Sequence, residues 1–169
     1  MLNRIFPALI DNRYRGHPVG LWLFVPIALI KLSQSLTHLL KYDGGAQSIS
    51  TIPLNTYPVS AAQNVIALFA RLGLEQLLLA SLFGLVLVRY RALIPLMYVL
   101  MVADFVGGKI VGQFKPLALA GTSGVSSPFL IVAILSVVGL ILSLIESRAP
   151  EARAARSPSL RRGKGQRKG

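Results

Sequence analysis

Apolar residues dominate four long stretches of the chain, and polar residues gather between and after them. A helix that crosses a bilayer needs about 20 mostly apolar residues. Four stretches reach this length, at about residues 18–40, 61–88, 92–112 and 128–145. The pattern therefore predicts an all-α fold, an integral membrane four-helix bundle.

Local signals mark the ends of these helices. Pro18 suits a first helical turn, where its missing N–H would be unpaired in any case. Ser60 followed by Gln63 fits a capping box at the start of the second span. The chain then divides into an N-terminal cytoplasmic or interfacial segment, a four-span domain and a tail, at residues 1–17, 18–147 and 148–169. Residues 1–10 suit either a short interfacial helix or an unstructured terminus.

Basic residues gather on the side of the chain that holds both termini. Those outside the tail are Arg4, Arg13, Arg15, Arg89 and Arg91. The two loops on the other side contain only Lys41 and Lys115. Cytoplasmic loops carry the excess of Lys and Arg. We therefore expect both termini in the cytoplasm, with the protein in a bacterial inner membrane.

Composition narrows the class of protein. The chain is 53% hydrophobic and only 14% charged, with Lys+Arg 18 against Asp+Glu 6 and a net charge of +12. Soluble domains carry about 25% charged residues, so a typical soluble enzyme is excluded. Because there is no cysteine, disulfides and thiolate metal sites are excluded too.

The tail at 148–169 is strongly basic and poor in apolar residues. Such a segment cannot bury enough surface to order itself, so we expect disorder. It could be a solvated tail that enforces topology, or it could bind anionic lipid headgroups. The residues for that lipid contact are Arg153, Arg156, Arg161, Arg162, Lys164, Arg167 and Lys168. Nucleic-acid binding is not favoured, because no aromatic residue is interleaved for base stacking.

Five ionisable residues lie within the predicted spans: Lys31, Arg71, Glu75, Asp104 and Lys109. Such residues usually face the interior of a bundle or water. At about 1.5 Å per residue, Lys31, Glu75 and Asp104 lie roughly 18–20 Å from the cytoplasmic boundary, and Arg71 and Lys109 roughly 26 Å. Lys31 and Arg71 could therefore pair with Glu75 and Asp104 across helices. Arg71 and Glu75 also lie four residues apart on one face of the second span.

A polar stripe on the first span extends this intramembrane polar cluster. Gln34, Ser35 and His38 share a helix face with Lys31, and that face should turn inward. The cluster can be read as structural ion pairs that fix helix register. It can also be read as a water-accessible pocket or proton pathway, in which Glu75 or Asp104 titrates.

Small residues predict where helices approach closely. Gly108 and Gly112 form a GxxxG spacing in the third span, which suits an internal helix contact or a dimer face. The fourth span carries a small-residue stripe for packing, at Ala133, Ser136, Gly139 and Ser143. Trp22 lies where an interfacial aromatic anchor is expected.

Motifs for catalysis and cofactors are absent from the sequence. There is no G-x-G-x-x-G, P-loop or G-x-S-x-G pattern, and His17 and His38 have no zinc-ligand spacing. We therefore predict no catalytic residue, no metal and no cofactor.

Three segments resemble small four-span bacterial inner-membrane proteins of the DoxX-like kind. They are the basic N-terminus, the ALIKL that runs from Ala28 to Leu32, and RLGLEQLLLASLFGLVLVRYR from Arg71 to Arg91. Many such proteins have no assigned activity, and some relatives are linked to quinone oxidation. The resemblance implies an architecture and carries over no site residue.

Three functions are compatible with these observations. We expect a non-enzymatic accessory or structural membrane component, with the lipid bilayer as its surroundings. A small oligomeric transporter or proton-coupled channel is the first alternative, and a quinone-linked oxidoreductase subunit is the second. A homo-oligomer or a membrane partner remains open.

Overall fold

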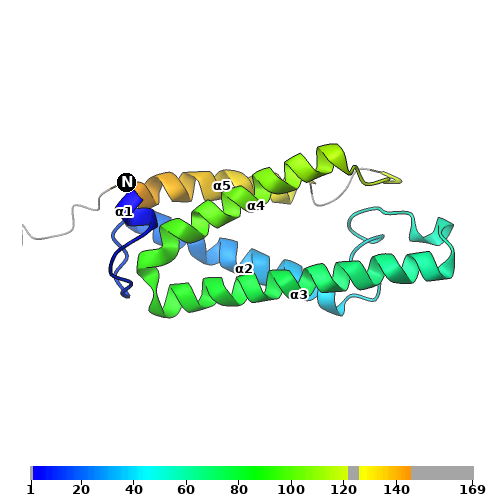
Figure 1. The fold of residues 1–169 in the computed structure, drawn as a ribbon, viewed down its shortest axis with the longest axis horizontal. Helices are drawn as coiled ribbons and strands as arrows, with labels where there is room; N and C mark the ends of the chain where they lie inside the picture. Colours follow the sequence, from blue (N-terminus) through cyan, green and yellow to red (C-terminus); the bar gives the residue numbers. More distant parts are fainter. Residues whose placement is uncertain (1, 122–125, 146–169) are drawn as a thin grey trace, which may run out of the picture.

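The computed structural model describes residues 2–121 and 126–145. Within these residues the chain is helical and has no strand (Figure 1). The elements in order are α1 (Leu2–Ile5), α2 (Pro18–Leu40), η1 (Leu54–Thr56), α3 (Val59–Arg89), η2 (Arg91–Leu93), α4 (Ile94–Phe114) and α5 (Ser126–Leu144). The all-α prediction is confirmed. The basic tail at 148–169, with its predicted lipid contacts, lies outside the described residues.

Three helical stretches in the described part of the chain are long and apolar enough to cross a membrane. They are Pro18–Leu40, Val59–Arg89 and Arg91–Phe114. The apolar stretch Phe129–Leu144 of α5 is shorter. Large apolar side chains cover the outside of the molecule, among them Leu78 at 65% exposure and Val88 at 73%. A surface of this kind is stable in lipid and costly in water.

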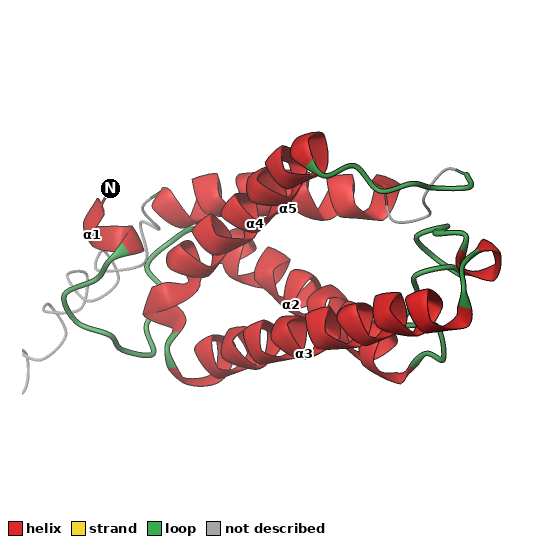
Figure 2. Cartoon of the chain, turned by 45° about the vertical axis from the view of Figure 1, so that its right-hand side comes forward, coloured by secondary structure: helices red, strands yellow, loops and turns green. Residues whose placement is uncertain are grey.

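Helix α2 is the centre of the arrangement. It packs most extensively against α3 and also against α5, and α5 in turn packs against α4. Helices α3 and α4 follow each other through η2 but make few direct contacts, and they separate as they leave that turn (Figures 1 and 2). The four long helices therefore do not form a closed, evenly packed bundle.

An aromatic cluster fills the half of the molecule nearest η2. The ring of Phe24 lies 5.2 Å from the rings of both Phe83 and Tyr98. The buried Tyr98 hydroxyl donates to the Gly20 carbonyl at 2.7 Å, which gives this polar atom the partner it needs inside an apolar core. The ring of Tyr98 lies directly against Gly139 of α5. Three helices thus meet at one tyrosine.

The small-residue stripe predicted for the fourth span is confirmed. Its members are all buried in α5: Ala133, Ser136, Gly139 and Ser143. They recur at three- or four-residue intervals, so they lie on one side of the helix. Their small size lets α5 fit against both α2 and α4.

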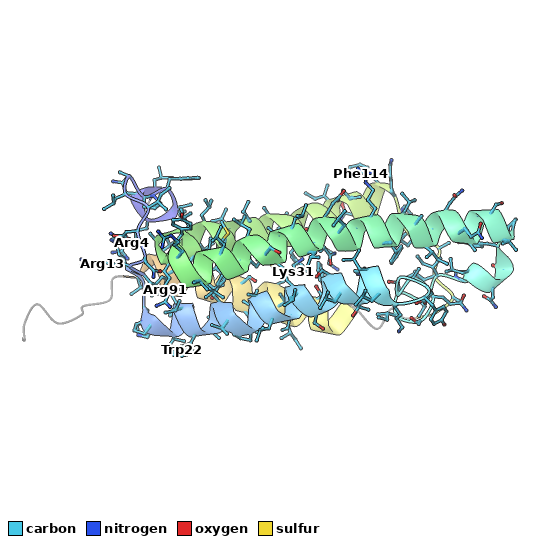
Figure 3. The ribbon with its side chains drawn as sticks, turned by 90° about the horizontal axis from the view of Figure 1, so that it is seen from below. Arg4, Arg13, Trp22, Lys31, Arg91 and Phe114 are labelled. Carbon is cyan, nitrogen blue, oxygen red and sulfur yellow. The ribbon has the colours of Figure 1, made fainter. Side chains whose placement is uncertain are left out.

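The end of the molecule that contains η2 is its basic end, where Arg4, Arg13 and Arg91 lie (Figure 3). Arg89 in the last turn of α3 and Arg15 beside Ala92 lie at the same end. The N-terminal segment folds back over this end. Arg4 Nη1 donates to the carbonyl of Leu144 at 2.8 Å, and the hydroxyls of Tyr14 and Ser143 are 2.8 Å apart. These bonds tie the segment before α2 to the last turn of α5.

A compact loop covers the opposite end. The buried carboxylate of Asp43 accepts the backbone N–H groups of Gly45 at 2.9 Å, Gln47 at 3.1 Å and Ser48 at 2.6 Å. Gly44 and Gly45 have φ of 61° and 79°, a region that glycine enters without steric cost. The loop is therefore fixed by one acidic side chain and two glycines.

The loop has a small apolar core of its own. Ala46, Ile52 and Leu54 are buried in it and pack against residues that include Phe69 of α3. Helix α3 is about 46 Å long at about 1.5 Å per residue, longer than a hydrocarbon layer of about 30 Å. The loop packs on the first turns of α3.

Two details of the predicted helix ends can be compared with the structure. Pro18 lies in the first turn of α2, as predicted. The capping box at Ser60 and Gln63 is wrong, because α3 already begins at Val59, with Pro58 as N-cap and no side-chain cap bond. Ser60 is thus inside the helix, where its backbone cannot take the extended conformation of an N-cap.

Gly139→Ala should destabilise the protein, because the added Cβ would collide with the ring of Tyr98. We expect the free energy of unfolding to fall by about 1–3 kcal/mol, as for other overpacked cores. Unfolding by denaturant in detergent micelles measures this. The control is Gly84→Ala in α3, where no described residue lies within 4 Å of the new Cβ. It should be neutral or stabilise by up to about 1 kcal/mol, and equal losses in both variants would contradict the prediction.

The loop around Asp43 should open in acid. Burial alone would raise the pKa of Asp43, but the N–H groups of Ser48 and Gly45 bond the carboxylate and bring its pKa below the usual range. Stability from this group is then present above the unfolded value of about 3.9 and is lost as pH falls through the folded pKa. Hydrogen-exchange protection of the Gly45 and Ser48 amides should hold from pH 7 to about 4 and fall below that.

Asp43→Asn should lose this protection already at pH 7, because one amide oxygen cannot accept hydrogen bonds from three donors. Unchanged protection in this variant would refute the role assigned to Asp43.

Candidate functional site

An ion pair joins α2 to α4 within the apolar part of the molecule. Lys31 Nζ lies 2.8 Å from Asp104 Oδ2. The Lys31 side chain is 3% exposed and that of Asp104 is 48% exposed. A hydrogen bond between two charged groups at this distance is among the strong ones in proteins. The pair lies about 20 Å along α2 from its first residue, at about 1.5 Å per residue.

Helical periodicity explains why these two residues meet. Lys31 follows Phe24 and Ile27 on the buried face of α2, and Asp104 follows Met97 and Met101 on the buried face of α4. Residues three, four and seven apart share a helix face. Each charged residue therefore lies one turn beyond the apolar core, on the side that already faces the other helix.

Ser35 and His38 of the polar stripe on α2 form hydrogen bonds with groups outside the ion pair. Ser35 is buried, and its hydroxyl donates to the carbonyl of Leu32 at 2.7 Å. His38 Nδ1 donates to the Gly44 carbonyl at 2.7 Å, and its ring lies 5.5 Å from that of Phe69. Gln34 is half-buried. The stripe thus links α2 to the loop and does not converge on the ion pair.

Arg71 and Glu75 form a separate pair on α3. Arg71 Nε lies 3.6 Å from Glu75 Oε1, and the two side chains are 78% and 64% exposed. Gly73, between them in sequence, packs against His38 of α2, so the pair points away from α2. The expected bonds across helices from Arg71 and Glu75 do not form in the structure.

The third span differs from expectation beyond Asp104. No described residue lies within 4 Å of a Cβ built on Gly108 or Gly112, so these glycines make no internal helix contact in the described part of the chain. Lys109 is exposed, and its Nζ lies 5.8 Å from the centroid of the Phe105 ring. The far end of α4, which holds these residues, lies away from α3 (Figure 2).

The chemistry of the site is limited to one acid and one base. Among residues 2–121 and 126–145, no three His, Cys, Asp or Glu residues are grouped so that they could hold a metal ion. The Lys31–Asp104 pair can neutralise charge and fix two helices, and its half-exposed carboxylate can accept a hydrogen bond from outside. Sequence reasoning overlooked Asp43, although Asp43-Gly44-Gly45 is a turn signal that could have indicated it.

Comparison of the chain with protein-family models, with curated proteins and with solved structures finds no match. The resemblance to DoxX-like proteins therefore remains a prediction. Function has to be argued from the residues of this chain.

Removing Asp104 should lower the free energy of unfolding more than removing Lys31. Asp104→Leu leaves the buried ammonium of Lys31 unpaired, and we expect a loss of about 3–5 kcal/mol in the free energy of unfolding. Lys31→Leu leaves a half-exposed carboxylate, so its loss should be smaller. The double variant should recover most of the stability, since two apolar side chains need no pairing. Unfolding in detergent micelles measures all three.

The matched control is Glu75→Gln, which breaks the exposed pair on α3. Exposed ion pairs contribute about 0–1 kcal/mol, so this variant should be close to the original protein. A double variant less stable than Asp104→Leu alone would show that the ion pair is not the reason for the loss.

Proposed function

We propose that this protein is a non-enzymatic accessory or structural component of a bacterial inner membrane. In this proposal the chain crosses the bilayer four times, with both termini in the cytoplasm. The observation that carries the proposal is the Lys31–Asp104 pair, a charge-neutral contact at 2.8 Å that joins two helices. A pair of this geometry suits the maintenance of helix register.

The fourth crossing is supported by α5. Its 19 residues extend about 28 Å at about 1.5 Å per residue, close to a hydrocarbon layer of about 30 Å. It ends at the basic end, where Arg4 bonds its last turn. The arginines at that end favour a cytoplasmic location under the positive-inside rule.

The core argues against a route through the helices. The half of the molecule between the ion pair and the basic end is filled by Phe24, Phe83 and Tyr98, each fully buried or nearly so. The Tyr98 hydroxyl is already bonded to Gly20. A polar path from Lys31 to the basic end would have to displace this cluster.

One observation favours the alternative of a small oligomeric transporter or proton-coupled channel. The Asp104 side chain is 48% exposed, whereas its partner Lys31 is 3% exposed. An acid with this exposure could exchange a proton with a water-filled space beside α4, provided that a second subunit excluded lipid from it. Transport would then depend on Asp104 as the titrating group.

Single cysteines in this cysteine-free chain distinguish the two functions. For the structural role, Ser35→Cys and Gly108→Cys, one turn from Lys31 and Asp104, should resist membrane-impermeant thiol reagents in intact cells. Ser48→Cys in the outer loop should react, and Arg13→Cys should react only after permeabilisation. Labelling of Arg13→Cys from outside would contradict the proposed orientation.

A flux measurement completes the test. The purified protein in liposomes with an internal pH dye should conduct no protons under a pH gradient. A flux that Asp104→Asn abolishes and that Glu75→Gln leaves unchanged would overturn the structural role in favour of the channel.

A further inference from the structure

A groove opens between α2 and α3 at the basic end of the molecule. Its volume is about 400 Å³, and it is lined by Leu21, Trp22, Val25, Leu87, Val88 and Arg91. We propose that this groove is a binding site for one anionic phospholipid, with an acyl chain along the apolar wall and the phosphate at Arg91. This inference does not depend on the accessory role and concerns a site separate from the ion pair.

The wall of the groove is apolar and outward-facing. Leu21 and Val25 are one turn apart on α2, and Trp22 between them is 71% exposed. Val88 on α3 is 73% exposed. Tryptophan at the level of the headgroups, with aliphatic side chains beyond it, is typical of a surface in contact with lipid at a membrane interface. An acyl chain covers such a wall with no need for a polar partner.

Arg91 is held at the rim of this wall. It follows the last turn of α3, and its Nε donates to the carbonyl of Leu87 at 2.8 Å. This bond fixes the guanidinium beside the groove, near Trp22 at the same end of the molecule (Figure 3). A guanidinium presents several donors in a fixed plane, which suits a phosphate.

The surrounding charge favours an anionic lipid over a neutral one. Arg13 and Arg89 lie at the same end as Arg91 (Figure 3). The nearby acid Asp11 is already bonded to Arg15, at 3.0 Å and 2.6 Å. Basic pockets between helices on the cytoplasmic side bind acidic lipid headgroups.

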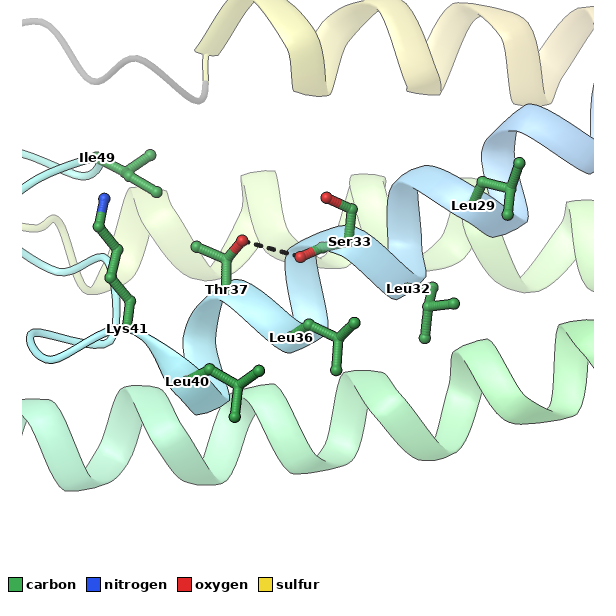
Figure 4. A pocket seen from close by; sticks show the side chains of 8 residues that line it. All are labelled: Leu29, Leu32, Ser33, Leu36, Thr37, Leu40, Lys41 and Ile49. Carbon is green, nitrogen blue, oxygen red and sulfur yellow. Dashed lines mark hydrogen bonds between the residues drawn. The ribbon is translucent and has the colours of Figure 1, made fainter.

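A second groove, at the other end of α2, shows why the basic end is the better site. It has a volume of about 730 Å³ and is lined largely by leucines such as Leu32, Leu36 and Leu40 (Figure 4). The Thr37 hydroxyl there donates to the Ser33 carbonyl at 2.9 Å. The charged residue in the lining of this second groove is Lys41. This groove is apolar enough to contact an acyl chain, but it has fewer positive charges around it than the groove at the basic end.

Native mass spectrometry of the full chain tests the proposal. The protein is released from micelles that contain equal amounts of phosphatidylglycerol and phosphatidylcholine. We expect one phosphatidylglycerol to be retained in preference to phosphatidylcholine. Arg91→Gln should weaken retention about tenfold, the effect of one lost charge-assisted hydrogen bond.

Two further variants separate the groove from general charge. Arg13→Gln removes the same charge at the same end, but Arg13 does not line the groove, so retention should fall far less than with Arg91→Gln. Val25→Trp fills the groove and leaves net charge and the Arg91–Leu87 bond intact, so retention should fall. Equal losses from Arg13→Gln and Arg91→Gln, or full retention in Val25→Trp, would overturn the proposal. So would equal retention of phosphatidylcholine.

Discussion

An ammonium group in an apolar interior requires an opposite charge within hydrogen-bond distance, because its hydration is lost and the local dielectric is low. Lys31 meets this requirement through Asp104. The consequence is structural, because α4 packs mainly against α5, has few contacts with α3, and meets α2 through the Tyr98–Gly20 bond and this pair. Together with Tyr98, the neutralised charge of Lys31 therefore fixes the position of α4 relative to α2.

The ion pair divides the molecule into two unlike halves. Toward the basic end the helices are held by ring contacts around Phe24 and by the Tyr98–Gly20 bond, and the N-terminal segment ties off α5. Beyond the pair, α4 separates from α2 and α3 (Figure 2), and Gly108 and Gly112 have no described neighbour within 4 Å of an added Cβ. Helices α2 and α3 remain together under the loop fixed by Asp43. The contacts that hold α4 to α2 thus lie on one side of Lys31.

The sequence could predict what depends on distance along the chain. Apolar length gave the helices within a few residues, and residue counts placed Lys31 and Asp104 at the same level, where their side chains meet at 2.8 Å. Rotation about a helix axis was harder, because it depends on which neighbour each face meets. Arg71 and Glu75 point away from α2 and pair with each other, and no described residue lies within 4 Å of a Cβ built on Gly108. The role of Asp43 depends on three backbone N–H groups; Asp43-Gly44-Gly45 signals a turn, but it does not specify which amides bond the carboxylate.

The unequal burial of Lys31 and Asp104 bears on how far α4 can move. A proton carrier needs its acid to lose its partner in one state, so that the acid can change charge. Separation of α4 from α2 would leave the ammonium of Lys31 unpaired beside Ala28 and Ser35, which are also buried. A buried charge without a partner is strongly destabilising. Movement of α4 is therefore opposed by the same contact that a carrier would have to break. For this reason the geometry agrees better with a pair that stabilises one arrangement of helices than with one that alternates between two.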